Sequence, residues 1–179
     1  MAISTKTGRL ILFIARIPPP ITGQAVACEA LYADLVRWGD DVTLVNLSKH
    51  SFRHGVDSNW HLLEIARILG KVLRHGRLSE LVYLTSAEST AGTLKDLAIV
   101  LCLGLRIGRT YPHMHGGTTM RQILSDRHPW LHRMNALLLR KVAGVTVLCD
   151  RFVSMTKIGR MNARLAWAEY RRTRHIWIG

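Results

Sequence analysis

The sequence has few acidic side chains, few cysteines and no long hydrophobic run. Its 179 residues contain 12 Asp and Glu against 25 Lys and Arg, a formal net charge of +13. The most apolar later window, residues 97–105, is far shorter than the roughly 20 residues that a membrane-spanning helix needs. Cys28, Cys102 and Cys149 are odd in number and far apart in apolar stretches. They are therefore interpreted as buried thiols in a reducing compartment, not as a disulfide framework.

Several motifs of common enzyme classes are also absent. There is no GxxxxGK[ST] and no GxGxxG after the first expected strand, which argues against a P-loop nucleotidase and a dinucleotide dehydrogenase. The absence of HExxH and GxSxG removes the commonest zinc protease and serine hydrolase signatures. Without Asp-x-Asp, no carboxylate pair is available to bridge a metal to a diphosphate. His113 and His115 are spaced as a metal pair, but no third ligand is marked, so neither a metal nor a cofactor is expected.

The N-terminal stretch is interpreted as a strand and not as a secretion signal. Lys6 and Arg9 precede a short apolar run, but Arg16 interrupts it and no small-residue cleavage site follows. A cytoplasmic protein is expected, with peripheral association at the inner face of the membrane.

Apolar runs and helical periodicities alternate along the chain. Each expected strand is followed by a helix-like segment, which predicts a parallel sheet. The fold class is therefore α/β, a Rossmann-like parallel sheet with helices on both faces and a basic C-terminal tail. Residues 1–157 are expected to form this domain, and 158–179 a tail that is either non-native, disordered or a short amphipathic helix. The expected strands are residues 10–15, 41–47, 81–85, 109–113 and 144–148; the expected helices are about 24–38, 60–75, 93–105, 129–141 and 150–157.

Two of these helices carry specific expectations. The first is predicted to begin at Thr22 and to stop before Gly39, with Ala27, Leu31, Leu35 and Trp38 on its apolar face. The helix at 93–105 is apolar nearly all round, and it is therefore expected to be mostly buried.

Three unusual loops follow the first, third and fourth strands: PPPITGQ, TSAES and HMHGG. Because ligands of open α/β sheets bind beyond the carboxyl ends of the strands, these loops are predicted to share one rim. Gly23 would let a ligand approach bare backbone at the start of a helix, where free N–H groups favour an anion. An ordinary connection between strand and helix accounts for the same spacing about equally well.

The third loop offers a second ligand contact. His115 stands before Gly116 and Gly117, which would let a sugar or phosphate reach main-chain N–H groups. Taken alone, His115 fits a structural histidine better. Glu88 and Asp96 are interpreted as solvated carboxylates, and no catalytic residue can be assigned.

The ordered set PPPITGQAVACEAL, LVYLTSAES, HMHGG and LLLRKVAGVTVLCD resembles the N-terminal domain of GT-B glycosyltransferases of the family-four, glycogen-synthase-like, retaining type. The resemblance covers about residues 9–157. It implies a metal-independent enzyme that transfers a sugar from a nucleotide sugar to a glycan or lipid-linked acceptor. It also implies donor-side roles for Gly23, Gln24, His115, Gly116 and Gly117, and acceptor-side loop positions for Thr22, Ser86 and Glu88.

The family's second Rossmann-like domain, with its nucleotide pocket, has no counterpart after residue 157. The sequence is therefore interpreted as a truncated or frameshifted chain or as half of a split enzyme, inactive without a separate C-terminal domain or subunit. The basic residues, with seven Lys and Arg in 151–179 against Glu169 alone, could meet an anionic membrane surface or form a solvated face. A non-catalytic binding module is the alternative function. Nucleic-acid binding is the least favoured of the three functions, because the sequence contains no recognisable nucleic-acid-binding motif.

Overall fold

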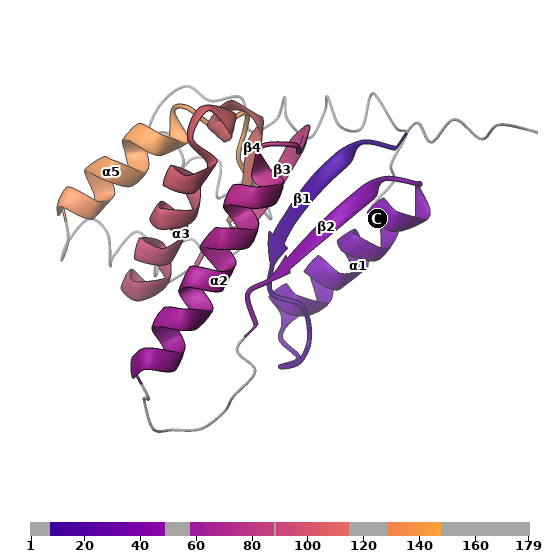
Figure 1. The fold of residues 1–179 in the computed structure, drawn as a ribbon, viewed down its shortest axis with the longest axis horizontal. Helices are drawn as coiled ribbons and strands as arrows, with labels where there is room; N and C mark the ends of the chain where they lie inside the picture. Colours follow the sequence, from indigo (N-terminus) through magenta and orange to yellow (C-terminus); the bar gives the residue numbers. More distant parts are fainter. Residues whose placement is uncertain (1–7, 49–57, 88, 115–128, 148–179) are drawn as a thin grey trace, which may run out of the picture. The chain divides into compact units, whose positions relative to one another are not determined.

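The computed structural model describes residues 8–48, 58–87, 89–114 and 129–147 (Figure 1). The chain divides into two compact units, Met1–Leu84 and Thr85–Gly179, which are described separately. The first unit contains β1 (Leu10–Ala15), α1 (Gly23–Arg37), β2 (Asp41–Asn46), α2 (Ser58–Gly76) and β3 (Leu81–Thr85), except that Thr85, the last residue of β3, belongs to the second unit. The second holds α3 (Thr90–Leu103), a 3₁₀ helix η1 (Gly104–Arg109), β4 (Thr110–Met114), α5 (Pro129–Leu139) and β5 (Thr146–Val147).

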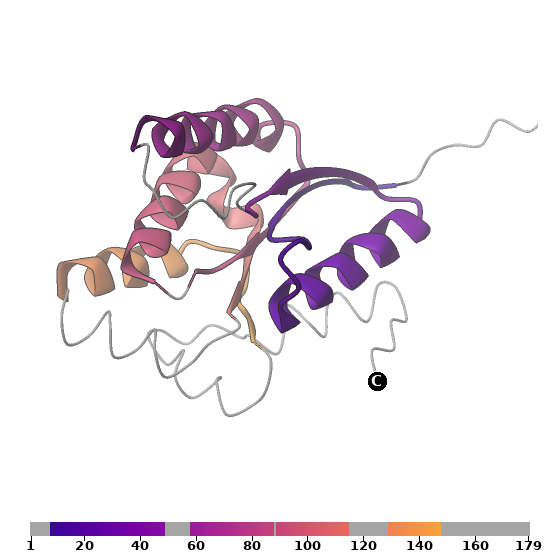
Figure 2. The same ribbon diagram turned by 90° about the horizontal axis from the view of Figure 1, so that it is seen from below.

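The sheet of the first unit has β1 at its centre. β1 pairs in parallel with β2 on one side, with Leu10 opposite Asp41, and with β3 on the other, with Ile11 opposite Leu81. α1 and α2 cover opposite faces of these strands (Figure 2). This explains the continuous apolar run of β1, whose residues are buried from Ile11 to Ala15, because side chains pointing to either face meet a helix.

Aromatic rings fill the core of the first unit. The rings of Phe13 and Tyr83, on neighbouring strands, stack with centroids 4.5 Å apart and planes 8° from parallel. Tyr32 of α1 tilts against Phe13 at 5.8 Å. These contacts place Phe13 and Tyr83 on the α1 side of the sheet, and they fix the helix to both strands.

The ends of α1 agree with the sequence prediction, and its buried face agrees only in part. Thr22 caps the helix, and Gly39 follows its end with φ +85°, a left-handed conformation that favours glycine. Ala27, expected on the apolar face, is exposed, whereas Ala25, Cys28 and Leu35 are buried. The prediction is right for Leu35 and missed Ala25 and Cys28, because such small residues carry little hydrophobic signal.

Backbone segments approach closely at the amino end of β1. The N–H of Asp41 donates to the carbonyl of Arg9 at 3.0 Å, and the N–H of Arg9 donates to Asp40 Oδ1 at 3.1 Å. A Cβ built on Gly8 would lie 1.9 Å from the carbonyl oxygen of Gly39. Only glycine fits at position 8 while this junction keeps its geometry.

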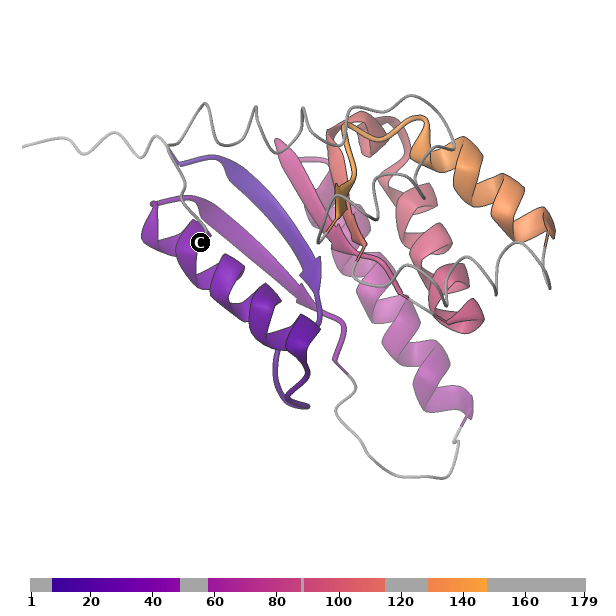
Figure 3. The ribbon, with the colours of Figure 1, turned by 180° about the vertical axis from the view of Figure 1, so that it is seen from behind.

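In the second unit, β4 and β5 pair in parallel, with His113 opposite Thr146 and Met114 opposite Val147. α3 and α5 lie side by side on one side of these strands (Figures 2 and 3). The N–H of Ala143, in the turn after α5, donates to the carbonyl of Thr110 at 3.0 Å and so fixes the approach to β5.

The expectation that the third helix is mostly buried is wrong for part of its surface. Thr93, Ile99, Val100 and Leu103 are buried, but Leu94 and Leu101 are exposed. An all-round apolar helix in this unit is covered along one side only. The helix also ends two residues before the predicted position 105, and the chain continues as the 3₁₀ helix η1, which the sequence analysis did not predict.

The protein is thus an α/β protein with parallel strands and a Rossmann-like arrangement, as its sequence predicts. In the part of the chain that the structure describes, no helix is long and apolar enough to cross a membrane. The tail at 158–179 and its boundary lie outside the described residues, so the predicted domain division stays a prediction.

Candidate functional site

The candidate site of the first unit lies where β1 passes into α1, at the carboxyl end of the strand. Thr22 is the N-cap of α1: its Oγ1 accepts a hydrogen bond from Ala25 N at 3.1 Å, and its carbonyl accepts one from Val26 N at 3.0 Å. Of the four amides that an α-helix leaves unpaired at its start, that of Ala25 is therefore satisfied locally, and the bond from Val26 is the first one within the helix.

Two of the remaining amides belong to Gly23 and Gln24, the residues for which the resemblance implies donor-side roles. Within the described parts of the chain, no group accepts a hydrogen bond from the N–H of Gly23 or of Gln24. Gly23 is exposed, and a Cβ built on it would meet nothing within 4 Å. The start of α1 therefore presents two amide donors, beside open space, at the positive end of a helix of 15 residues.

Asn46, at the end of β2, fixes the loop that leads to this helix. Its Oδ1 accepts from the N–H of Ile17 at 3.3 Å and from the N–H of Ser48 at 2.8 Å. The Ser48 hydroxyl, which is buried, donates to the carbonyl of Ile17, and the N–H of Leu47 donates to the carbonyl of Ala15. The first residues after β1 are thus tied to the end of β2, which limits the freedom of the proline segment and of Thr22 beyond it.

A comparable turn stands at the start of α3 in the second unit. The N–H of Ser86 donates to the carbonyl of His113 at 2.9 Å, so the turn begins level with the end of β4. Ser89 caps α3, its hydroxyl oxygen accepting from Gly92 N at 3.1 Å. Ser86 itself is half-buried.

Asp96 holds this second turn from inside α3. Its Oδ2 accepts from the N–H of Ala87 at 2.6 Å, and the residue is buried. The interpretation of Asp96 as a solvated carboxylate is therefore wrong. Gly92 completes the turn, because a Cβ there would lie 2.4 Å from the Cβ of Ala87.

The predicted site residues fall into three groups. Thr22, Gly23 and Gln24 lie together at the start of α1, and Ser86 lies at the turn before α3. Glu88, His115, Gly116 and Gly117 lie outside the described residues. The prediction that the three loops share one rim is therefore neither confirmed nor contradicted.

Sequence reasoning missed the two residues that position these turns. Asn46 is the last residue of an expected strand, and Asp96 lies inside an expected helix. Neither position indicates that the side chain accepts a hydrogen bond from the backbone of another segment. A polar side chain within an apolar stretch is the one available signal, because burial of such a group requires a hydrogen-bond partner.

Two ionisable groups of the first unit lie in its core and away from the start of α1. Burial raises the pKa of the Cys28 thiol from 9.0 to about 11, partly offset by a hydrogen bond with Tyr83. Burial also raises the pKa of the Tyr83 hydroxyl, with a smaller contribution from Cys28. Both groups are neutral near pH 7, so this pair stabilises packing and supplies no nucleophile.

Among the described residues, no three His, Cys, Asp or Glu side chains are grouped as metal ligands would be. The fold and the two turns define an α/β protein whose helix starts stand at the carboxyl ends of parallel strands. Comparison with protein-family models, with curated proteins and with solved structures found no match.

Proposed function

We propose that this protein is the acceptor-side half of a GT-B-type glycosyltransferase. In this proposal a sugar passes from a nucleotide sugar to a lipid-linked or polysaccharide acceptor, with retention and without a bound metal. The bond between the sugar and the diphosphate breaks, a bond to an acceptor hydroxyl forms, and the hydroxyl proton leaves with the diphosphate. The resemblance of the ordered loop sequences suggests this class, and the start of α1 supplies the chemical argument.

The observation that carries the proposal is the pair of amides at Gly23 and Gln24. Their N–H groups have no acceptor within the described chain, and Gly23 leaves open space beside them. A phosphate or sugar oxygen placed there would accept two hydrogen bonds and would meet the positive end of the helix. His115, with Gly116 and Gly117, is proposed to contact the transferred sugar, and Thr22, Ser86 and Glu88 to line the acceptor side.

The affinity expected for a nucleotide sugar at the start of α1 determines which binding assay is suitable. Two hydrogen bonds to a charged group contribute about 3–6 kcal/mol together, which corresponds to a dissociation constant between several millimolar and a few tens of micromolar, before the entropy lost on association weakens it. In the GT-B class a second Rossmann-like domain contributes most of the nucleotide contacts. Binding to this half alone should therefore be weak, and calorimetry would miss it.

Amide chemical shifts are the appropriate measurement. Titration of the ¹⁵N-labelled protein with uridine and guanosine diphosphate sugars should move the resonances of Gly23 and Gln24 at millimolar ligand. Gly23→Val should abolish these shifts, because the added side chain fills the space beside the amides.

Gly70→Val is the matched control. Gly70 is exposed in α2, and a Cβ there also meets nothing within 4 Å, so both variants place valine at an exposed helical position without a steric clash. Shifts spread over the whole surface, or shifts that Gly23→Val leaves intact, would contradict the proposal.

The second candidate is a non-catalytic binding module that docks a partner subunit. Ile21, beside the cap residue Thr22, is 83% exposed, so this loop offers a large apolar side chain to a partner. A partner that covers this loop would bury it. Sedimentation of the Ile21→Ser variant and of the unchanged chain separates the two candidate functions. If the protein is a binding module, the variant should lose self-association or partner association, and nucleotide sugars should cause no amide shifts.

A further inference from the structure

The positive charge of the described residues is concentrated in the second unit. The described part of the first unit has seven Lys and Arg and six Asp and Glu. The described part of the second has six Lys and Arg, and its one carboxylate, Asp96, is buried in a hydrogen bond to the backbone. Over these described ranges, the surface of the second unit therefore carries cations without exposed anions.

Arg133 shares one side of α5 with exposed apolar side chains, and Arg140 and Lys141 follow in the turn after the helix. Trp130 is 53% exposed, Met134 37% and Leu137 55%. Arg133, Arg140 and Lys141 are exposed as well. The four positions on α5 recur at intervals of three or four residues and so lie on one side of the helix, and Arg140 and Lys141 continue this spacing in the turn that follows. We name this set the α5 face: Trp130, Arg133, Met134, Leu137, Arg140 and Lys141.

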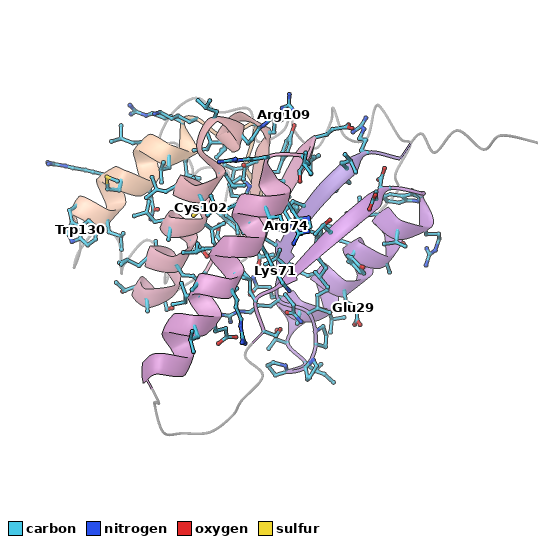
Figure 4. All side chains as sticks on the ribbon, in the orientation of Figure 1. Glu29, Lys71, Arg74, Cys102, Arg109 and Trp130 are labelled. Carbon is cyan, nitrogen blue, oxygen red and sulfur yellow. The ribbon has the colours of Figure 1, made fainter. Side chains whose placement is uncertain are left out.

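The opposite side of α5 accounts for the packing of the helix. Leu131 and Val142 are buried, and Asn135 and Leu138 between them are half-buried, again at intervals of three or four. The helix therefore packs in the core through its other side, and the α5 face is not required for that packing. Trp130 stands at the outer end of the helix (Figure 4).

We infer that the α5 face lies on an anionic lipid surface. A helix with this pattern lies in the plane of the headgroups, with aliphatic side chains among the acyl chains and Arg and Lys at the phosphates. Tryptophan prefers the same boundary, because its ring is apolar and its N–H is polar. The same unit also exposes Leu94, Leu101 and Leu105, on α3 and η1.

Two other occupants fit the α5 face less well. A nucleic acid would meet the cations but would leave Met134 and Leu137 without a role, since phosphate contacts need no aliphatic partner. A second copy of the chain would bring cations against cations, which costs free energy at an interface. The inference is independent of the proposed donor site, because it concerns another unit and is measured without a nucleotide sugar.

The experiment is co-sedimentation of the full chain with vesicles of phosphatidylcholine alone or mixed with an equal amount of phosphatidylglycerol. Binding should need the anionic lipid. The triple variant Arg133→Gln, Arg140→Gln and Lys141→Gln should weaken it roughly 100-fold, at about fivefold per basic residue. The matched control removes three cations from α2, with Arg67→Gln, Lys71→Gln and Arg74→Gln, and should bind within a few-fold of the unchanged chain.

A second pair of changes tests the apolar part. Met134→Gln with Leu137→Gln should weaken vesicle binding roughly tenfold, while binding to heparin stays unchanged. Brominated phosphatidylglycerol should quench tryptophan fluorescence, and Trp130→Phe should remove part of that quenching. All substituted side chains are exposed, so circular dichroism should show an unchanged fold.

Several results would overturn the inference. Equal losses in the two triple variants would mean attraction by net charge alone. An unchanged vesicle affinity in the Met134 and Leu137 variant would rule out insertion of these two side chains among the acyl chains. If that variant instead abolished self-association, the α5 face would be an interface between copies.

Discussion

The side chain of Asn46 offers the sharpest test of how the candidate site is held. Asn46→Ala removes the acceptor of two amides, those of Ile17 and Ser48, at 3.3 and 2.8 Å. Both bonds are partly buried, so water replaces the lost acceptor only in part. An unsatisfied buried donor costs about 1–3 kcal/mol, and the longer bond contributes the smaller share. We expect the free energy of unfolding to fall by about 2–4 kcal/mol.

Urea unfolding followed by circular dichroism measures this loss. The transition should move to lower urea with an unchanged slope, because the surface exposed on unfolding stays nearly the same. Asn46→Asp is the matched variant: it keeps an oxygen at the Oδ1 position and should recover most of the lost stability at neutral pH. A loss below about 0.5 kcal/mol for Asn46→Ala, a typical surface value, would refute the reasoning. Equal losses for alanine and aspartate would refute it too.

Two further predictions concern close packing and pH. Gly8→Ala should destabilise the fold by several kcal/mol, because its Cβ would lie 1.9 Å from the carbonyl oxygen of Gly39, whereas Gly70→Ala should stabilise it by up to about 1 kcal/mol in the same thermal unfolding assay. The raised pKa of Cys28 stabilises the fold fully below pH 9, and this contribution is lost as the pH rises through about 11. Cys28→Ala should therefore flatten the alkaline fall of the urea midpoint between those values; an identical fall in both proteins would contradict the assignment.

The order of strands and helices could be read from the sequence because each depends on neighbouring residues. The apolar run of β1, the cap at Thr22 and the stop at Gly39 are local signals, and all three agree with the structure. The buried side of α1 was predicted only in part, at Leu35, because Ala25 and Cys28 compete poorly with larger residues in a periodicity argument.

The ties that hold the turns could not be read in this way. Asn46 reaches a backbone amide 29 residues away, and Ser48 reaches a carbonyl 31 residues away. Such partners are set by strand register, which no local pattern contains. The same limit explains the error at Asp96, since a carboxylate in a helix is usually solvated and only the approach of Ala87 makes it structural.

Close packing in the turn before α3 limits which residues can occupy positions 87 and 92. Positions 87 and 92 together leave room for a single methyl group, since a Cβ on Gly92 would lie 2.4 Å from that of Ala87. A side chain at position 92 therefore requires that Ala87 first become glycine, and its Cβ would still lie 3.0 Å from Ser89 Oγ. Descendants of this chain that keep the turn should thus carry glycine at one of the two positions, and any exchange between them should pass through glycine at both.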